Sequence, residues 1–379
     1  MTEQPQTFPS GLTREEIETR VGKLLSIAEE CDTINDLRDL FARKSTFIAY
    51  NGFEPSGKIH IAQAILTVIN ANTIFECGGL YKIYIADWFA QLNHKMGGDL
   101  EKIRVLGKYF IEVFKACGLK DGAVEYIWAS EMIESSKTYL PLVLDISMKN
   151  TVNRITRCSQ IMGRGEKDQL TTSQLFYPCM QCADIFELEC DVCQLGLDQR
   201  KVNMLAREYA QQTKRQPPVV LSHHMLMGLK GAAAGKMSKS IPDSAIFMSD
   251  SYDDIKRKIS KAFCNDEVEG NPIFEYIRYI LAPHLKKITL CGKEYTKEDI
   301  MPGFREKDEE GKILLGKKEF CEEFKKMDKR QLKDDVARLI NDCLEPVRKH
   351  FDTEEGRKLL ETIASWNAEA EKKPAQKKK

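Results

Sequence analysis

Residues 46–63 read TFIAYNGFEPSGKIHIAQ, an order of residue types that predicts a strand, a loop and a helix. The first four residues are β-branched, aromatic or apolar, which is typical of a buried strand. A loop containing Gly52, Pro55 and Gly57 follows. Apolar residues at helical spacing begin after His60, and a helix that starts there presents free N–H groups to an anion. The stretch therefore predicts the phosphate-facing unit of a doubly wound parallel sheet.

A second informative stretch is the string KMSKS at residues 236–240, which follows GAAAG. Two lysines three residues apart, between small residues that let the backbone move, can close two cationic side chains over a polyphosphate. A short run of lysine and serine is equally typical of a solvated loop, so the string alone leaves both interpretations open. Together with the loop before His60 it indicates a site for ATP.

Length and charge limit the class of protein. With 379 residues the chain is long enough for two domains with a full-sized core. Lys plus Arg equals Asp plus Glu, 57 each, so contacts with nucleic acid have to come from local basic patches. The sequence contains no run of about 18 apolar residues and begins without the pattern of a signal peptide. We expect a cytoplasmic protein that has neither a membrane nor DNA as a partner.

Twelve cysteines lie mostly in apolar segments, which fits reduced thiols. Cys179, Cys182, Cys190 and Cys193 form two C-x-x-C pairs, a pattern that zinc sites also use. Only seven residues separate the two pairs, whereas about 15 to 20 do so in the usual zinc ribbon. Zinc is thus the less favoured alternative, and we expect buried free thiols with no protein-bound zinc.

Composition predicts an α/β part followed by a smaller helical part. After about residue 252 the sequence becomes rich in Lys, Glu and Asp with amphipathic helical patterns. The predicted parts are an N-terminal helical segment (1–40), a Rossmann-like doubly wound parallel-sheet domain (41–251) with a helical insertion near 129–175, a mainly helical C-terminal domain (252–366) and a basic mobile tail (367–379).

Periodicity places further elements along the chain. Short apolar runs predict strands, and longer periodic stretches predict helices. Thr13 and Glu16 form the capping-box pattern of a helix start. The predicted strands are 81–86, 124–128, 190–195 and 219–222. The stretch 140–160 is predicted to be helical, and the stretch near 285–320 is expected to form a loop or short strands.

Four segments together carry a family resemblance. They are the loop that ends at His60, YPCMQCAD at 177–184, GLDQRK at 196–201 and the lysine string at 236–240. Their order and spacing resemble class I aminoacyl-tRNA synthetases, specifically the tyrosyl-tRNA synthetases of the eukaryotic and archaeal type. The resemblance covers about residues 40–350.

The resemblance implies a two-step reaction. L-tyrosine would react with Mg²⁺-bound ATP to give tyrosyl-adenylate and pyrophosphate, and the tyrosyl group would pass to the terminal adenosine of tRNA(Tyr). A carboxylate is already a nucleophile at pH 7, so catalysis would consist of positioning and charge stabilisation. The family precedent also implies a homodimer joined through the insertion, with the C-terminal helical domain against the anticodon loop.

The resemblance gives roles to residues that face ATP. His60 corresponds to the first histidine of the family's His-Ile-Gly-His signature and would donate to the phosphates. Lys236 and Lys239 would bind the departing pyrophosphate, and Ser238 would add a hydroxyl. This chain departs from the signature because Ala62 and Gln63 replace its glycine and second histidine, as eukaryotic members also do.

Further residues of this chain correspond to positions that bind ATP and the amino acid in this family. Gly52 would let the loop backbone approach ATP, and Gly196 and Asp198 match the turn that contacts the ribose. The residues that match the site for the tyrosine ammonium and backbone are Tyr50, Tyr177, Gln181 and Gln199.

Asp184 matches the carboxylate that receives the phenol hydroxyl. Phenylalanine lacks that hydroxyl and would leave a buried carboxylate unpaired. Each of these residues, taken singly, can also have an ordinary structural role. The tyrosines can be core aromatics, the glutamines polar surface residues, and the aspartate a helix-capping or ion-paired acid. Two other functions stay open: a tryptophanyl-tRNA synthetase, which Asp184 disfavours, and a catalytically silent RNA-binding relative, which the complete set His60, Lys236, Ser238 and Lys239 disfavours.

Overall fold

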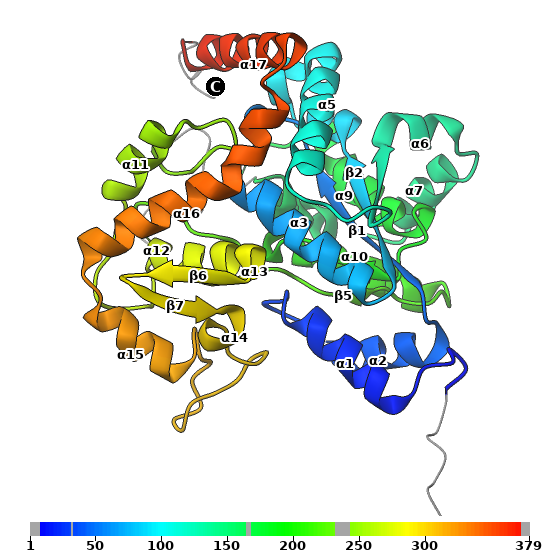
Figure 1. Cartoon of the computed structure of the whole chain (residues 1–379). Coiled ribbons are helices and arrows are strands. Elements are labelled where there is room, and N and C mark those ends of the chain that lie inside the picture. Colours follow the sequence, from blue (N-terminus) through cyan, green and yellow to red (C-terminus); the bar gives the residue numbers. More distant parts are fainter. Residues whose placement is uncertain (1–7, 32, 164–167, 232–242, 373–379) are drawn as a thin grey trace, which may run out of the picture. The chain divides into compact units, whose positions relative to one another are not determined.

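The computed structural model describes residues 8–31, 33–163, 168–231 and 243–372 (Figure 1). The chain divides into two compact units. The first unit holds residues 1–56, 71–107 and 120–224, and the second holds 57–70, 108–119 and 225–379. Helices α3 (Ile61–Glu76) and α5 (Leu100–Ala116) each run through both units.

The first unit is built on a five-stranded parallel sheet with the strand order β3-β2-β1-β4-β5. This order is that of a doubly wound sheet, and it reverses between β1 and β4, where ligands of such sheets bind beyond the carboxyl ends of the strands. The predicted fold class is therefore confirmed. The strands are β1 (Phe47–Phe53), β2 (Gly79–Ile85), β3 (Val124–Trp128), β4 (Val192–Cys193) and β5 (Val219–Val220).

The strand predicted from residues 46–49 continues to Phe53 because the residues after it still pair. Tyr50 and Gly52 keep parallel register with Lys82 and Tyr84 on β2. Tyr50 is buried, as expected for a central strand covered on both faces. This extension brings Gly52, near the end of β1, and Glu54, directly after β1, to the carboxyl edge of the sheet.

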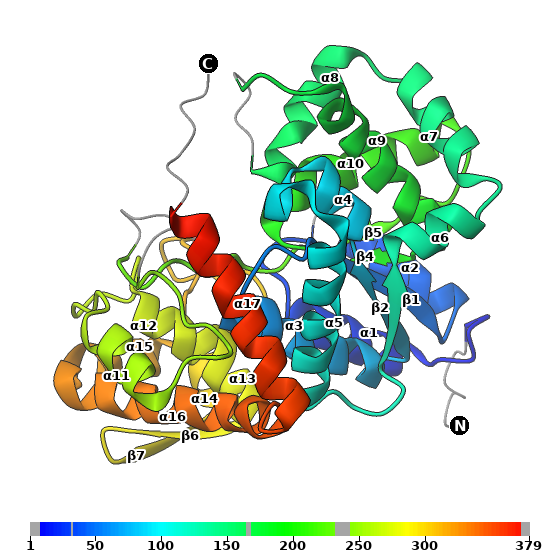
Figure 2. The same ribbon diagram turned by 90° about the horizontal axis from the view of Figure 1, so that it is seen from above.

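The helical insertion and its neighbours form a group of packed helices (Figure 2). The stretch 140–160, predicted to be helical, is helical over most of its length, but it is divided into two shorter helices and a 3-10 turn. Thr151 starts the second of them by accepting a hydrogen bond from the backbone N–H of Arg154, which satisfies one of the free donors of a helix start. The helices are α6 (Ala129–Ser135), α7 (Tyr139–Met148), α8 (Val152–Cys158), α9 (Thr172–Glu187) and α10 (Arg200–Gln212).

The remaining elements of the first unit are short helices. Thr13 and Glu16 form the predicted capping box at the start of α1. None of the helices in the described ranges is both long and apolar enough to cross a membrane. These elements are α1 (Arg14–Leu25), α2 (Ile34–Arg43), α4 (Asp87–Leu92) and the 3-10 turns η1 (Lys95–Gly98), η2 (Ser159–Met162) and η3 (Leu197–Gln199).

The second unit is mainly helical beyond residue 251, as predicted, and its central helix α16 (Lys329–His350) buries the predicted apolar face. The stretch near 285–320 contains a two-stranded antiparallel hairpin. The predicted boundary at 251/252 stays a prediction. The other elements are α11 (Tyr252–Ser260), α12 (Pro272–Glu275), η5 (Tyr276–Leu281), α13 (Ala282–Leu285), β6 (Lys287–Leu290), β7 (Lys293–Thr296), α14 (Lys297–Ile300), α15 (Lys318–Lys326) and α17 (Glu354–Lys372).

Candidate active site

Helix α9 carries the segment that the sequence singled out. Tyr177, Gln181 and Asp184 follow one another at spacings of four and three residues, so they share one face of the helix. All three side chains are buried. A polar face on a buried helix needs partners, and the partners of these side chains form two hydrogen-bonded clusters in the first unit, around Asp184 and around Glu54. We call these clusters the two ends of the candidate substrate pocket.

The first end is centred on Asp184, whose side chain is 1% exposed. The hydroxyl of Tyr84 on β2 donates to Oδ1 of Asp184 at 3.0 Å, and the hydroxyl of Tyr139 on α7 donates to the same oxygen at 2.7 Å. The pKa of Asp184 is raised to about 8, because the effect of burial outweighs the lowering by these two hydrogen bonds. The carboxylate is thus held in an apolar environment chiefly by tyrosine hydroxyls.

Tyr50 belongs to the same end of the pocket. Its hydroxyl is buried and has no hydrogen-bond partner among the described residues. Burial raises the pKa of Tyr50 well above its usual range, and Asp184 is one of the neighbours that add to this shift. A buried hydroxyl without a partner is costly, so the group is available to a ligand that brings a polar atom beside Asp184.

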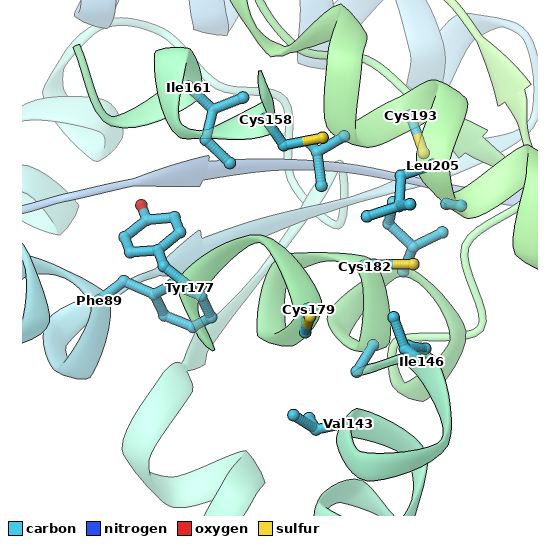
Figure 3. Close-up of a cluster of buried hydrophobic side chains, with 14 of the residues drawn as sticks. Phe89, Val143, Ile146, Cys158, Ile161, Tyr177, Cys179, Cys182, Cys193 and Leu205 are labelled. Atoms are coloured by element: carbon cyan, nitrogen blue, oxygen red, sulfur yellow. The ribbon is translucent and has the colours of Figure 1, made fainter. Parts of the chain in front are cut away.

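The second end is centred on Glu54, directly after β1. The hydroxyl of Tyr177 donates to Oε1 of Glu54 at 2.7 Å, and Nδ2 of Asn93 lies 3.1 Å from each carboxylate oxygen. Lys95 approaches the same carboxylate at 3.4 Å. The ring of Tyr177 packs edge-on against Phe89 with ring centroids 4.8 Å apart (Figure 3). Burial and Glu54 raise the pKa of the Tyr177 hydroxyl, which therefore stays a donor.

The two glutamines lie together as predicted. Nε2 of Gln181 donates to Oε1 of Gln199 at 3.1 Å. Nε2 of Gln199 in turn donates to the carbonyl of Ile161 at 3.2 Å and to Oδ1 of Asp198 at 3.3 Å. The predicted amino-acid residues and the predicted ribose turn are therefore joined by direct hydrogen bonds.

The two predicted nucleotide glycines lie at the strand ends where the sheet order reverses. A Cβ atom on Gly52 would find its nearest neighbour, a ring carbon of Tyr84, at 3.7 Å, an ordinary contact. Packing within the protein therefore does not require glycine there, and the role of Gly52 in letting the backbone approach ATP stays a prediction. Gly196 begins the 3-10 turn that contains Asp198 and pairs with His223 in an isolated parallel bridge.

A chain of buried polar side chains crosses beneath this edge of the sheet. The hydroxyl of Tyr81 donates to Oε1 of Gln194 at 2.7 Å, and Nε2 of Gln194 lies 3.1 Å from Nδ1 of His223. Burial lowers the pKa of His223 to about 4, so the imidazole is neutral at pH 7. These hydrogen bonds join β2 to the residues that directly follow β4 and come soon after β5.

The predicted phosphate-binding residues fall outside the first unit or outside the described residues. His60 precedes α3 in the second unit and pairs with Phe247 in an isolated bridge, and its Nδ1 accepts from the backbone N–H of Gln63 at 3.3 Å. Lys236, Ser238 and Lys239 lie outside the described residues. The roles of these four residues stay predictions.

The cysteine pairs lie in and beside a hydrophobic cluster (Figure 3). Cys179 and Cys182 on α9 and Cys193 on β4 are buried in it, and Cys190 is partly buried at its edge. Burial raises the pKa of all four thiols, that of Cys179 to about 11, and a protonated thiol is a poor zinc ligand. No group of three or more His, Cys, Asp or Glu within the described ranges is arranged to hold a metal ion.

Sequence reasoning missed several residues of the pocket. Glu54 stood inside the quoted loop and could have been recognised as a charge at a strand end. Tyr84 and Tyr139 gave no signal, because a buried tyrosine in a strand or helix is indistinguishable from a core residue until its hydroxyl partner is known. Asn93 likewise follows a short helix without any motif.

Comparison with known proteins assigns the family. The model of the tRNA synthetases class I (W and Y) matches residues 42–345. Tyrosine–tRNA ligase 1, cytoplasmic, of Arabidopsis thaliana is 48% identical over 364 residues, which cover 93% of this chain and 90% of the relative. The chain belongs to the tyrosyl-tRNA synthetases. The predicted eukaryotic and archaeal type is confirmed as well.

Solved structures of other synthetases agree with this assignment. Leishmania major tyrosyl-tRNA synthetase in complex with tyrosinol has a TM-score of 0.83 and 41% identity, over 92% of this chain and 60% of that one. Tyrosyl-tRNA synthetase from Archaeoglobus fulgidus, complexed with L-tyrosine, has a TM-score of 0.76 and 33% identity, over 88% of this chain and 99% of that one. The class I synthetase fold thus extends over most of the chain.

Proposed function

We propose that the protein is a tyrosine–tRNA ligase, which activates L-tyrosine with ATP and transfers it to the terminal adenosine of tRNA(Tyr). The observation that carries the proposal is the buried pair of Asp184 and Tyr50, a carboxylate beside a hydroxyl without a partner, in a pocket at the ligand-binding edge of the sheet. Named relatives of the same family support it.

The phenol end of the substrate would lie against Asp184 and Tyr50. The substrate hydroxyl can donate to the carboxylate and accept from Tyr50, so it satisfies both buried groups at once. Phenylalanine would leave both unsatisfied. Discrimination of about a hundred-thousand-fold against phenylalanine is established for this enzyme class. Tyr50, expected at the ammonium end from the sequence, is here assigned to the phenol end.

The ammonium end would lie against Glu54, Tyr177, Gln181 and Gln199. Glu54 supplies a negative charge that attracts the ammonium, and its contacts with Tyr177 and Asn93 hold it in place. The glutamines supply acceptors and donors for the amino-acid backbone. The substrate carboxylate then faces the carboxyl edge of the sheet, where it can attack the α-phosphate without a general base.

Mg²⁺-bound ATP is the second substrate. Gly52 and Gly196 give the nucleotide close access to the backbone, and Asp198 would accept from the ribose hydroxyls. His60, Lys236, Lys239 and Ser238 are proposed to bind the phosphates and stabilise the charge that develops on pyrophosphate. No step requires a protein-bound metal.

The test is ATP–pyrophosphate exchange with tyrosine, phenylalanine and tryptophan as alternative substrates. Exchange with tyrosine and negligible exchange with the other two is the expected result. Exchange with tryptophan and not with tyrosine would identify a tryptophan enzyme, and no exchange with any amino acid would favour a catalytically silent RNA-binding protein. Charging of tRNA(Tyr) by the exchange-competent protein then tests the second step.

We also propose that the protein is a homodimer joined through the insertion. Leu140, Met148 and Val152 are 62%, 78% and 67% exposed, and with Leu144 they recur every four residues, which forms an apolar stripe along α7 into α8. Exposed apolar patches of this kind mark interaction surfaces.

The cytoplasmic name of the Arabidopsis relative supports a cytoplasmic location. The helical region after residue 251 is proposed to contact the anticodon loop.

Sedimentation analysis tests the dimer. The wild type should sediment at twice the mass of the 43.3 kDa chain, and the double variant Leu140→Glu/Met148→Glu at the mass of one chain. Ile313→Glu changes an exposed apolar residue elsewhere and should leave the dimer intact. A monomeric wild type, or a dimeric double variant, would contradict the proposal.

A further inference from the structure

We propose that Tyr84 and Tyr139 are positioning residues, which hold the carboxylate of Asp184 so that it accepts the phenol hydroxyl of the substrate. They thereby set the preference for tyrosine over phenylalanine. The inference rests on the proposed function and adds two residues for which neither the sequence motifs nor the comparisons give a role.

The geometry concentrates both hydroxyls on one carboxylate oxygen. Tyr84 and Tyr139 donate to Oδ1 of Asp184 at 3.0 and 2.7 Å. A carboxylate oxygen has two lone-pair sites, so two donors fill Oδ1 and direct any further donor to Oδ2. Rotation of the carboxylate would break both hydrogen bonds, and these bonds therefore fix its orientation.

The two tyrosines come from elements that are far apart in the sequence. Tyr84 lies on β2 and Tyr139 on α7, and each is almost fully buried, at 2% and 3% exposed. Their rings form part of the hydrophobic cluster around the pocket. Removing only the hydroxyl, as in a change to phenylalanine, keeps the ring packing and isolates the hydrogen bond.

The carboxylate depends on these hydroxyls because of what surrounds it. Hydroxyl donors lower the pKa of Asp184, whereas burial and the nearby Glu187 raise it. No lysine or arginine forms an ion pair with Asp184 in the described part of the chain. The titratable groups that face Asp184 are Tyr50 on β1, Tyr84 on β2, Tyr139 on α7, Tyr177, Cys182 and Glu187 on α9, and Cys190 before β4.

Tyr139 has one other acceptor within reach, the carbonyl of Met180 at 3.2 Å. Since a hydroxyl carries one proton, the shorter contact with Asp184 takes it. Tyr84 has no second acceptor among the described hydrogen bonds. Both hydroxyl protons are thus donated to Asp184. The substrate hydroxyl would supply the third hydrogen-bond donor to this carboxylate.

The experiment compares Tyr84→Phe and Tyr139→Phe with the wild type in pyrophosphate exchange, with tyrosine and with phenylalanine. In each variant kcat/KM for tyrosine should fall about tenfold or more, the loss expected for one hydrogen bond to a charged group, while kcat/KM for phenylalanine stays within about twofold. The pH midpoint of kcat/KM for tyrosine should also rise, because a donor that lowers the pKa of Asp184 has been lost.

Tyr209→Phe is the matched control. Tyr209 belongs to the same hydrophobic cluster as Tyr84 and Tyr139, and its hydroxyl also donates to a carboxylate, Oδ2 of Asp145 at 2.6 Å, but that carboxylate is not Asp184. The control should leave both substrates and the pH midpoint unchanged.

The outcomes separate the possible failures. Equal losses of kcat/KM for tyrosine and for phenylalanine would show general damage to the pocket. An unchanged preference for tyrosine over phenylalanine in both variants would show that neither hydroxyl positions Asp184. Either result overturns the proposal. Each variant tests the inference separately, so one that fails to fold does not remove the test. A wild type that does not activate tyrosine would instead refute the proposed function.

Discussion

Replacing Asp184 by asparagine should weaken the use of tyrosine while leaving the fold intact. The amide has nearly the same size as the carboxylate, and its carbonyl oxygen can still accept from Tyr84 and Tyr139. At a pH above 8, where the Asp184 carboxyl with its pKa of about 8 is ionised, the change removes the negative charge and the acceptor that faces the substrate hydroxyl. The variant therefore isolates the recognition of that hydroxyl.

The magnitude follows from the hydrogen bond that is lost. A hydrogen bond to a charged group contributes about 1.5–3 kcal/mol, and about 1.4 kcal/mol corresponds to a factor of ten. Asp184→Asn should accordingly lower kcat/KM for tyrosine by about 10- to 150-fold. Phenylalanine leaves Oδ2 of the Asp184 carboxylate without a donor in the wild type and only an amide without a partner in the variant, so kcat/KM for phenylalanine should stay constant or rise.

Pyrophosphate exchange with tyrosine and with phenylalanine measures the kcat/KM for each amino acid, and their ratio tests this prediction. The ratio of kcat/KM for tyrosine to that for phenylalanine should collapse in the variant, with the KM for ATP unchanged. A variant that keeps the wild-type ratio would show that the hydroxyl is recognised by another residue and that the buried carboxylate has only a structural role. A parallel loss for both substrates would point to a disturbed pocket.

Two further predictions concern charge in the pocket. The pKa of Asp184 is raised to about 8 in the folded protein, so the contribution of Asp184 to stability is present at acidic pH and is lost as the pH rises towards 8. Because Asp184→Asn cannot titrate, the melting temperature of this variant relative to wild type should be higher at pH 8 than at pH 5. Parallel pH profiles of the two melting temperatures would place the titration in another group. Glu54→Gln should raise the KM for tyrosine about tenfold without changing the KM for ATP. Inhibition by 3-(4-hydroxyphenyl)propionate, which lacks the ammonium group, should be unaffected. Equal weakening of tyrosine and this inhibitor would show that Glu54 does not bind the ammonium group.

The sequence was most informative where function depends on local spacing. The strand–loop–helix order of residues 46–63 is formed by neighbours along the chain, and the structure confirms it. Tyr177, Gln181 and Asp184 share a helix face because their spacing follows the helical repeat. The helical stretch expected over 140–160 is divided after α7, since the capping hydrogen bond of Thr151 competes with helix continuation.

The sequence of this chain was sufficient for the class of fold, the family and the polar face of α9, because each depends on residues that are close in sequence. Only the tertiary structure showed what surrounds Asp184. Tyr84 and Tyr139 lie 100 and 45 residues away from it, and the sheet and the helical insertion bring their hydroxyls to a single oxygen. A buried carboxylate must find its donors wherever the fold supplies them, and no local pattern records which buried tyrosines they are.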